Sequence, residues 1–271
     1  MKYFKSLIII VLLFACNMAK GQSEASILDR IDFNDTTMIN NDLMWETIAE
    51  YITTEQNKSA YDKKMYDVIL AADNVLSRSC TSYTMYKAVY QYLIYGFSEI
   101  GANQAVDYMM RMPYLDNIDA TKEQYDEING LALQYERVKI GSKAPDIQTK
   151  TILKLEITLS EIKALKTVIL FWSYSCPHCR DMISELGQLA KSNPEVAIVT
   201  VNVSGDIKKV KRLIKKSHLE KTYNICDGLG WRSPIVEDYA VDMTPSLFLL
   251  DENKIIIAKP FDIEELKTAI E

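Results

Sequence analysis

Histidine, glycine and cysteine are all scarce in this chain of 271 residues, and each shortage narrows the range of possible sites. The two histidines, His178 and His218, are too few for a histidine-rich metal site. No glycine-rich phosphate loop and no paired-carboxylate motif stand out, so nucleotide, protease and lysozyme-like chemistry have no support. The net charge is −6 without a sustained basic tract, which gives no reason to expect nucleic acid or an anionic membrane surface as a partner.

Residues 1–21 have the pattern of a signal peptide. Lys2 and Lys5 precede an apolar stretch, Leu7 to Ala15, which is too short to span a membrane. Small residues just before Gln22 offer a cleavage site. We therefore expect export to the periplasm or cell envelope, leaving a mature chain long enough for two domains with separate cores.

The five cysteines divide between this leader and the rest of the chain. Cys16 offers an alternative to cleavage, because it ends a segment similar to a lipoprotein box and would be acylated there, although the bulky Phe14 fits that box poorly. The four downstream cysteines are too few for a disulfide-stapled scaffold but enough for one redox pair in an oxidising compartment. We interpret Cys80 and Cys226 as small buried residues, with an interdomain disulfide between them as the alternative.

Residues 22–139 are predicted to form a helical N-terminal domain. From about Asn41 to Lys139, apolar and aromatic residues recur at spacings of three and four, and glycine and proline are nearly absent. A stripe of tyrosines within this region is typical of packing in a small helical bundle rather than of a peptide groove. Breaks at Gly101 and Pro113 separate helices expected at 42–55, 59–77, 82–100, 103–112 and 121–139.

A second domain is predicted over residues 140–271, after the turn signals Gly141 and Pro145. Two continuous apolar runs are typical of parallel strands that are buried on both faces. The helix that follows the second run has a lysine-rich outer face, which we interpret as solvated surface. The predicted order is strand 168–172, helix 177–192, strand 196–201, helix 207–217, strand 246–250, strand 254–258 and a helix from 262.

Cys176 and Cys179 are the residues that carry chemistry. They are separated by two residues at a strand-to-helix junction, about one helical turn from each other, which is close enough for a disulfide. Cys176 falls at the helix N-terminus, where free N–H groups favour a thiolate, so we expect it to attack while Cys179 resolves. Pro177 suits the first helical position, and His178 between the thiols further stabilises the Cys176 thiolate.

Half of a zinc site is the alternative interpretation of this pair. Such a site needs a second pair of ligands at short spacing, and only Cys226 and His218 are candidates. Redox chemistry is favoured by the context, with Trp172 just upstream and Thr244-Pro245 ahead of a later apolar strand.

The segment Phe171 to Cys179, together with Met243-Thr244-Pro245, resembles the thioredoxin superfamily and within it the envelope-located TlpA/ResA-like branch. The resemblance covers about Gly141 to the end of the sequence and implies an α/β thioredoxin-like fold, a central mixed sheet flanked by helices. It also implies thiol-disulfide oxidoreductase activity with no cofactor beyond the redox-active Cys176–Cys179 disulfide. Pro245 is then cis and faces this pair, the backbone of Thr244 binds an extended substrate, and Trp172 packs behind the sulfurs.

The helical half is similar to a domain of unknown function that precedes thioredoxin-like modules in Bacteroidetes. Two positions depart from the relatives of the second half. Leu170 stands where many of them place a polar or acidic residue beneath the thiols, and Met182 stands where the ResA-like proteins are often acidic. The usual proton acceptor for Cys179 is therefore absent, and the direction of electron flow stays open.

The partners that the resemblance implies are protein disulfides or thiols, with a membrane electron donor as a further candidate. Two other functions remain as alternatives. A thiol peroxidase of the AhpC/TSA type shares the Ala144-Pro145-Asp146 opening, but the proline and threonine that cradle peroxide in those enzymes are not found before Cys176. A binding module would use the helical domain to recruit a partner to a thioredoxin scaffold.

Overall fold

The computed structural model describes residues 26–57, 64–111 and 114–271, and the predicted signal peptide and Cys16 lie outside them. The chain divides into two compact units, Met1–Leu133 and Gln134–Glu271, which are described separately. The division falls inside helix α6 (Lys122–Arg137), a few residues before the predicted domain boundary. No helix within the described ranges is long and apolar enough to cross a membrane.

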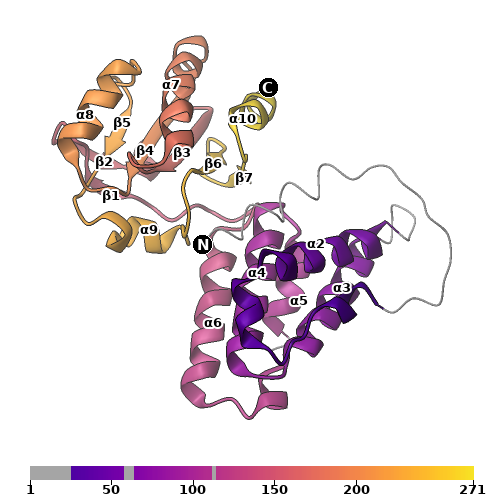
Figure 1. Ribbon diagram of the computed structural model, residues 1–271. Helices are drawn as coiled ribbons and strands as arrows, with labels where there is room; N and C mark the ends of the chain where they lie inside the picture. Colours follow the sequence, from indigo (N-terminus) through magenta and orange to yellow (C-terminus); the bar gives the residue numbers. More distant parts are fainter. Residues whose placement is uncertain (1–25, 58–63, 112–113) are drawn as a thin grey trace. The chain divides into compact units, whose positions relative to one another are not determined.

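The first unit is all-α, as predicted (Figure 1). Tyr92 shows how its tyrosines pack, because its ring lies 4.7 Å from that of Trp45, centroid to centroid, and its hydroxyl donates to the Trp45 carbonyl at 3.1 Å. Tyr86 and Tyr90 are buried as well, which confirms the packing interpretation. The helices are α2 (Asp42–Gln56), α3 (Lys64–Ser79), α4 (Tyr83–Glu99), α5 (Asn103–Arg111) and α6, with 3₁₀ turns η1 (Ile27–Arg30), η2 (Thr36–Asn40) and η4 (Tyr114–Ile118).

The second unit is built on a mixed five-stranded sheet with strand order β5-β4-β3-β6-β7 (Figure 1). The apolar runs form parallel neighbours β3 (Lys166–Trp172) and β4 (Val196–Asn202) at its centre, as their composition predicts. Strand β5 (Tyr223–Ile225) runs parallel to β4, whereas β6 (Ser246–Leu250) runs antiparallel to β3 and β7 (Ile256–Ala258) antiparallel to β6. This is the predicted thioredoxin-like arrangement.

Two apolar cores lie on opposite faces of the sheet. Helices α7 (Pro177–Ser192), α8 (Ile207–Lys216) and α10 (Ile263–Ile270) contribute to the core that contains Cys179 and alternate residues of β3. Helix α9 (Pro234–Asp238) and the segment after β1 contribute to the core on the other face. Because the β3 side chains alternate between these cores, both faces of the central strand are buried from solvent.

Four short elements of this unit are missing from the predicted order. They are the hairpin β1 (Gln148–Lys150) and β2 (Glu156–Thr158), the edge strand β5 and the helix α9. Each strand has only three residues, which is too few to show a period. In β5 the central residue is Asn224, a buried polar side chain that accepts a hydrogen bond from the Thr200 hydroxyl at 2.8 Å.

Gly187 is required where α7 passes the end of α8. A Cβ atom at this position would lie 1.8 Å from the backbone oxygen of Ser217, and backbone cannot move aside as a flexible side chain can. We expect Gly187→Ala to lower the free energy of unfolding by about 3 kcal/mol. Urea unfolding followed by circular dichroism measures this, with Gly130→Ala in α6 as control.

A Cβ atom at Gly130 would meet no atom within 4 Å. Its replacement by alanine should therefore stabilise the helix by about 1 kcal/mol or less. Equal destabilisation by both substitutions would contradict the close approach at Gly187.

Candidate active site

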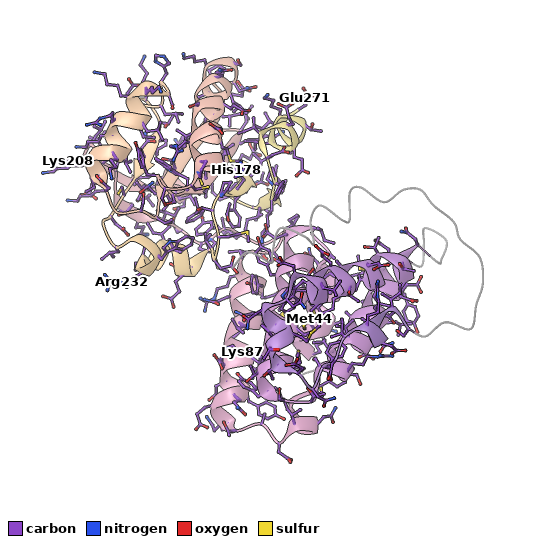
Figure 2. All side chains as sticks on the ribbon, in the orientation of Figure 1. Met44, Lys87, His178, Lys208, Arg232 and Glu271 are labelled. Atoms are coloured by element: carbon purple, nitrogen blue, oxygen red, sulfur yellow. The ribbon has the colours of Figure 1, made fainter. Side chains whose placement is uncertain are left out.

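The two thiols sit where β3 passes into α7. Cys176 is the N-cap of α7, and its Sγ accepts a hydrogen bond from the Cys179 N–H at 3.3 Å. Pro177 occupies the first turn, where its missing N–H costs nothing. His178 is exposed on the same turn (Figure 2). The sequence therefore places Cys176 at the N-cap of α7 and Cys179 within its first turn.

The two sulfurs differ in their access to solvent. Cys176 is half-buried, whereas Cys179 is 0% exposed and packs in the core with Trp172 and Met182. Burial raises the pKa of the Cys179 thiol to about 12, and the adjacent Cys176 sulfur adds to the increase. Of the two sulfurs, only that of Cys176 is partly exposed, so it is the one that a substrate could reach.

Thr244 and Pro245 lie beside the thiols, although Thr244 is 68 residues after Cys176 in the sequence. The Thr244–Pro245 peptide bond is cis, as the resemblance implies. The Cys176 Sγ donates to the Thr244 carbonyl at 3.7 Å, and the Thr244 side chain makes a hydrogen bond with Cys179. The pairing of Phe171 with Ser246 explains this meeting, because it aligns the end of β3 with the start of β6.

The floor beneath the thiols is apolar. Trp172 and Leu170 are fully buried on the same face of β3 as Cys179. Leu170 therefore brings an apolar side chain rather than a carboxylate to this face of β3. The Thr244 side chain and the Ser173 backbone make hydrogen bonds that partly oppose the rise in the Cys179 pKa.

A hydrogen-bond network that the sequence did not reveal holds the residues before Cys176, and it starts from the buried Asn202. Asn202, at the end of β4, donates from Nδ2 to the Trp172 carbonyl at 3.2 Å. Its Oδ1 accepts from the Ser204 hydroxyl at 2.7 Å, and the Ser204 Oγ accepts from the Tyr174 N–H at 3.0 Å. Arg180 of α7 donates to the Tyr174 carbonyl at 3.0 Å. The only sequence signal is a polar residue that ends an otherwise apolar run.

We expect Asn202→Leu to slow thiol exchange about tenfold, because the turn that carries Cys176 loses its anchor. The measurement is the rate of insulin disulfide reduction. Asn224→Leu is the matched control, since both asparagines are 2% exposed and hydrogen-bonded, but Asn224 has no bond to the turn. If the two variants lost the same activity at the same loss of stability, Asn202 would have no positioning role.

Within the described residues the other two cysteines, Cys80 and Cys226, are free thiols, as are Cys176 and Cys179. Cys226 is buried, and its Sγ lies 3.9 Å from Asn202 Oδ1. Cys80 is half-buried, and its Sγ donates to the Leu76 carbonyl at 3.3 Å. Burial raises the pKa of both thiols, which agrees with their interpretation as small packed residues. Across the described ranges, no group of three or more His, Cys, Asp or Glu side chains could hold a metal ion.

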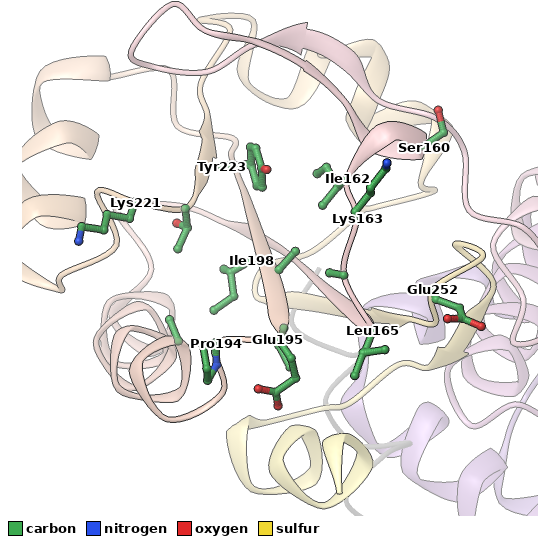
Figure 3. A pocket seen from close by; sticks show the side chains of 15 residues that line it. Ser160, Ile162, Lys163, Leu165, Pro194, Glu195, Ile198, Lys221, Tyr223 and Glu252 are labelled. Atoms are coloured by element: carbon green, nitrogen blue, oxygen red, sulfur yellow. The ribbon is translucent and has the colours of Figure 1, made fainter.

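A separate hollow of about 780 Å³ lies at the opposite ends of the strands (Figure 3). Leu165 and Glu195, which come just before β3 and β4, line it together with Lys163 and Tyr223. Cys176 follows the other end of β3, so this hollow is not part of the thiol site.

Comparison with known proteins identifies the second unit. The AhpC/TSA family model matches residues 140–259. The thioredoxin-like protein YneN of Bacillus subtilis (strain 168) is 28% identical over 121 residues, which are 44% of this chain and 69% of that protein. A thiol-disulfide oxidoreductase from Bacteroides fragilis NCTC 9343 is similar at 22% identity, over 48% of this chain and 97% of that one, with a TM-score of 0.44.

One solved structure matches both units. A thioredoxin-like protein from Bacteroides caccae ATCC 43185 covers 95% of this chain and 97% of its own, at 12% identity and a TM-score of 0.60, which shows a shared fold. The family match spans the domain that holds Cys176, Cys179 and the cis Thr244–Pro245 bond. The C-terminal unit therefore has a thioredoxin-like fold, and its residues 140–259 match the AhpC/TSA family model.

Proposed function

We propose that the protein exchanges disulfides with protein substrates in the cell envelope through Cys176 and Cys179. The observation that carries this proposal is the pairing of a half-exposed N-cap thiol with a fully buried thiol one turn behind it. The cis Thr244–Pro245 bond lies beside the accessible sulfur, where the Thr244 backbone would bind an extended substrate segment.

The exchange proceeds in two displacements. The Cys176 thiolate attacks one sulfur of a substrate disulfide, forms a mixed disulfide, and the other substrate sulfur leaves as a thiolate that takes up a proton. Cys179 then loses its proton and attacks the Cys176 sulfur, which releases the second substrate thiolate. Two electrons pass to the substrate, and the Cys176–Cys179 disulfide remains. His178 tunes the pair from the exposed first turn, and Trp172 packs behind it.

The location of the protein in the cell envelope is part of the same proposal. Lys2, Lys5 and the apolar stretch that follows support export to the envelope, with an acylated Cys16 as the lipid-anchored alternative. A membrane electron donor would return the pair to its reduced form. Fractionation of cells that produce the full chain, followed by mass measurement of its mature N-terminus, separates cleavage before Gln22 from acylation at Cys16.

A thiol peroxidase is the second candidate, because the AhpC/TSA family match includes the domain opening at Ala144-Pro145-Asp146. Purified protein should reduce insulin disulfides. Its consumption of hydrogen peroxide should be no faster than that by free dithiothreitol. Rapid peroxide consumption without insulin reduction would replace the proposal by the peroxidase.

The direction of electron flow follows from the reduction potential of the pair, measured by equilibration in glutathione buffers and alkylation of the free thiols. A value near that of thioredoxin, about −270 mV, supports a disulfide reductase. A value near that of DsbA, about −120 mV, supports a disulfide donor or isomerase.

A further inference from the structure

Helix α8 concentrates positive charge in a chain whose net charge is −6. Six of its ten residues are lysine or arginine, and none is acidic. Within the described residues, only Lys209 of these six forms an ion pair, with Asp206 at 3.2 Å. Figure 2 shows Lys208 pointing away from the domain. Like charges at i and i+4 destabilise a helix, so a solvated face alone does not account for this density.

A groove with apolar walls lies between this helix and the β1–β2 hairpin. Its volume is about 460 Å³. Leu153 and Leu155, at the hairpin turn, are 57% and 63% exposed, and Tyr223 at the start of β5 is also exposed. Exposed leucines gathered in one hollow, rather than scattered singly, mark an interaction site. The apolar walls are thus a second observation, independent of the charge.

The charged groups of this groove are predominantly positive. Lys211, Lys215 and Lys221 line it and are exposed. Two carboxylates also line it, but Glu156 is paired with Lys150 at 2.9 Å, which leaves Glu220 as the opposing charge. A partner that fits must therefore bring negative charge to the rim and apolar side chains to the walls.

We propose that the groove between α8 and the β1–β2 hairpin docks an acidic protein segment that carries leucine-like side chains. The groove contains none of the thiols, so this proposal does not depend on the redox function. A lipid surface fits less well. Val210 and Ile214, at the centre of the apolar face of α8, are buried in the core of the domain, which leaves only Ile207 at the start of the helix exposed and too little apolar surface to insert.

The test uses a short fluorescent peptide in which Glu and Leu alternate, titrated with the full chain and followed by fluorescence anisotropy. Reversal of the three groove lysines should raise the Kd at least about tenfold. A peptide with Ser in place of Leu should bind about tenfold more weakly, because the apolar walls lose their contacts. The groove variant is Lys211→Glu/Lys215→Glu/Lys221→Glu.

A matched control reverses three charges of α8 that do not line the groove. It has the same net charge as the groove variant, and its Kd should change less than about threefold, through the long-range field alone. A circular dichroism spectrum and a urea unfolding midpoint equal to those of the wild type show that both variants are folded. The control variant is Lys208→Glu/Arg212→Glu/Lys216→Glu.

Three results would overturn the proposal. They are a peptide that does not bind, equal weakening by the two triple variants, and binding that does not require the peptide's leucines. Phosphatidylglycerol vesicles provide the last comparison. If the chain bound these vesicles but not the peptide, and the groove variant abolished that binding, the surface would be a membrane contact instead.

Discussion

Cys176→Ser should reduce the rate of insulin disulfide reduction by about a thousand-fold or more, to the background level, because Cys176 is the half-exposed sulfur of the pair and the one with which the proposed exchange begins. Cys179 is fully buried in the core, so it cannot replace Cys176 as the attacking group. The rate is measured under excess glutathione with equal amounts of folded protein.

Cys179→Ser should have a different effect. Its Cys176 still attacks, but no thiol resolves the mixed disulfide, so covalent protein–substrate complexes accumulate and are seen on non-reducing gels. Cys226→Ser is the matched control, since Cys226 is buried in the same core and its thiol donates to Asn202 Oδ1 at 3.9 Å, a donor that serine retains. This control should retain full activity. Activity in the Cys176 variant would end the proposed mechanism.

The regularity of the longer elements explains why they could be predicted. The apolar runs that became β3 and β4 are long enough to show that both faces are buried, and the structure confirms them. Helices α2 and α4 follow from their apolar spacing and are capped by Asn41 and Ser82, whose side chains accept from the first turn. Strand β5 escaped prediction because its three residues are held by pairing with β4 rather than by any local pattern.

The residues of the site also differ in whether the sequence alone could place them. Cys176 and Cys179 are separated by only two residues, and this spacing is sufficient to place them on one helical turn. Thr244 could be placed beside them only through the family resemblance, since the contact depends on the antiparallel pairing of β3 and β6. Asn202 was missed because nothing in its neighbourhood distinguishes an asparagine that anchors a turn from one that simply ends a strand.

The apolar floor beneath the thiols makes the second displacement sensitive to pH. Burial, the largest cause, raises the pKa of the Cys179 thiol well above its usual value, so the neutral thiol dominates near pH 7 and the reactive thiolate increases with pH. With Leu170 in place of an acceptor, no carboxylate takes the proton from below. We expect the rate of release from a Cys176 mixed disulfide to increase about tenfold per pH unit, or about a thousand-fold between pH 7 and pH 10.

Stopped-flow measurement of thiol release from a preformed mixed disulfide tests this dependence. Leu170→Asp supplies the acceptor that relatives place here, so it should accelerate release at pH 7 and flatten the profile, provided that circular dichroism shows a folded domain. A wild-type rate that does not change between pH 7 and pH 10 would show that another group removes the Cys179 proton. The Thr244 side chain, already hydrogen-bonded to Cys179, would then be the first residue to replace, with valine.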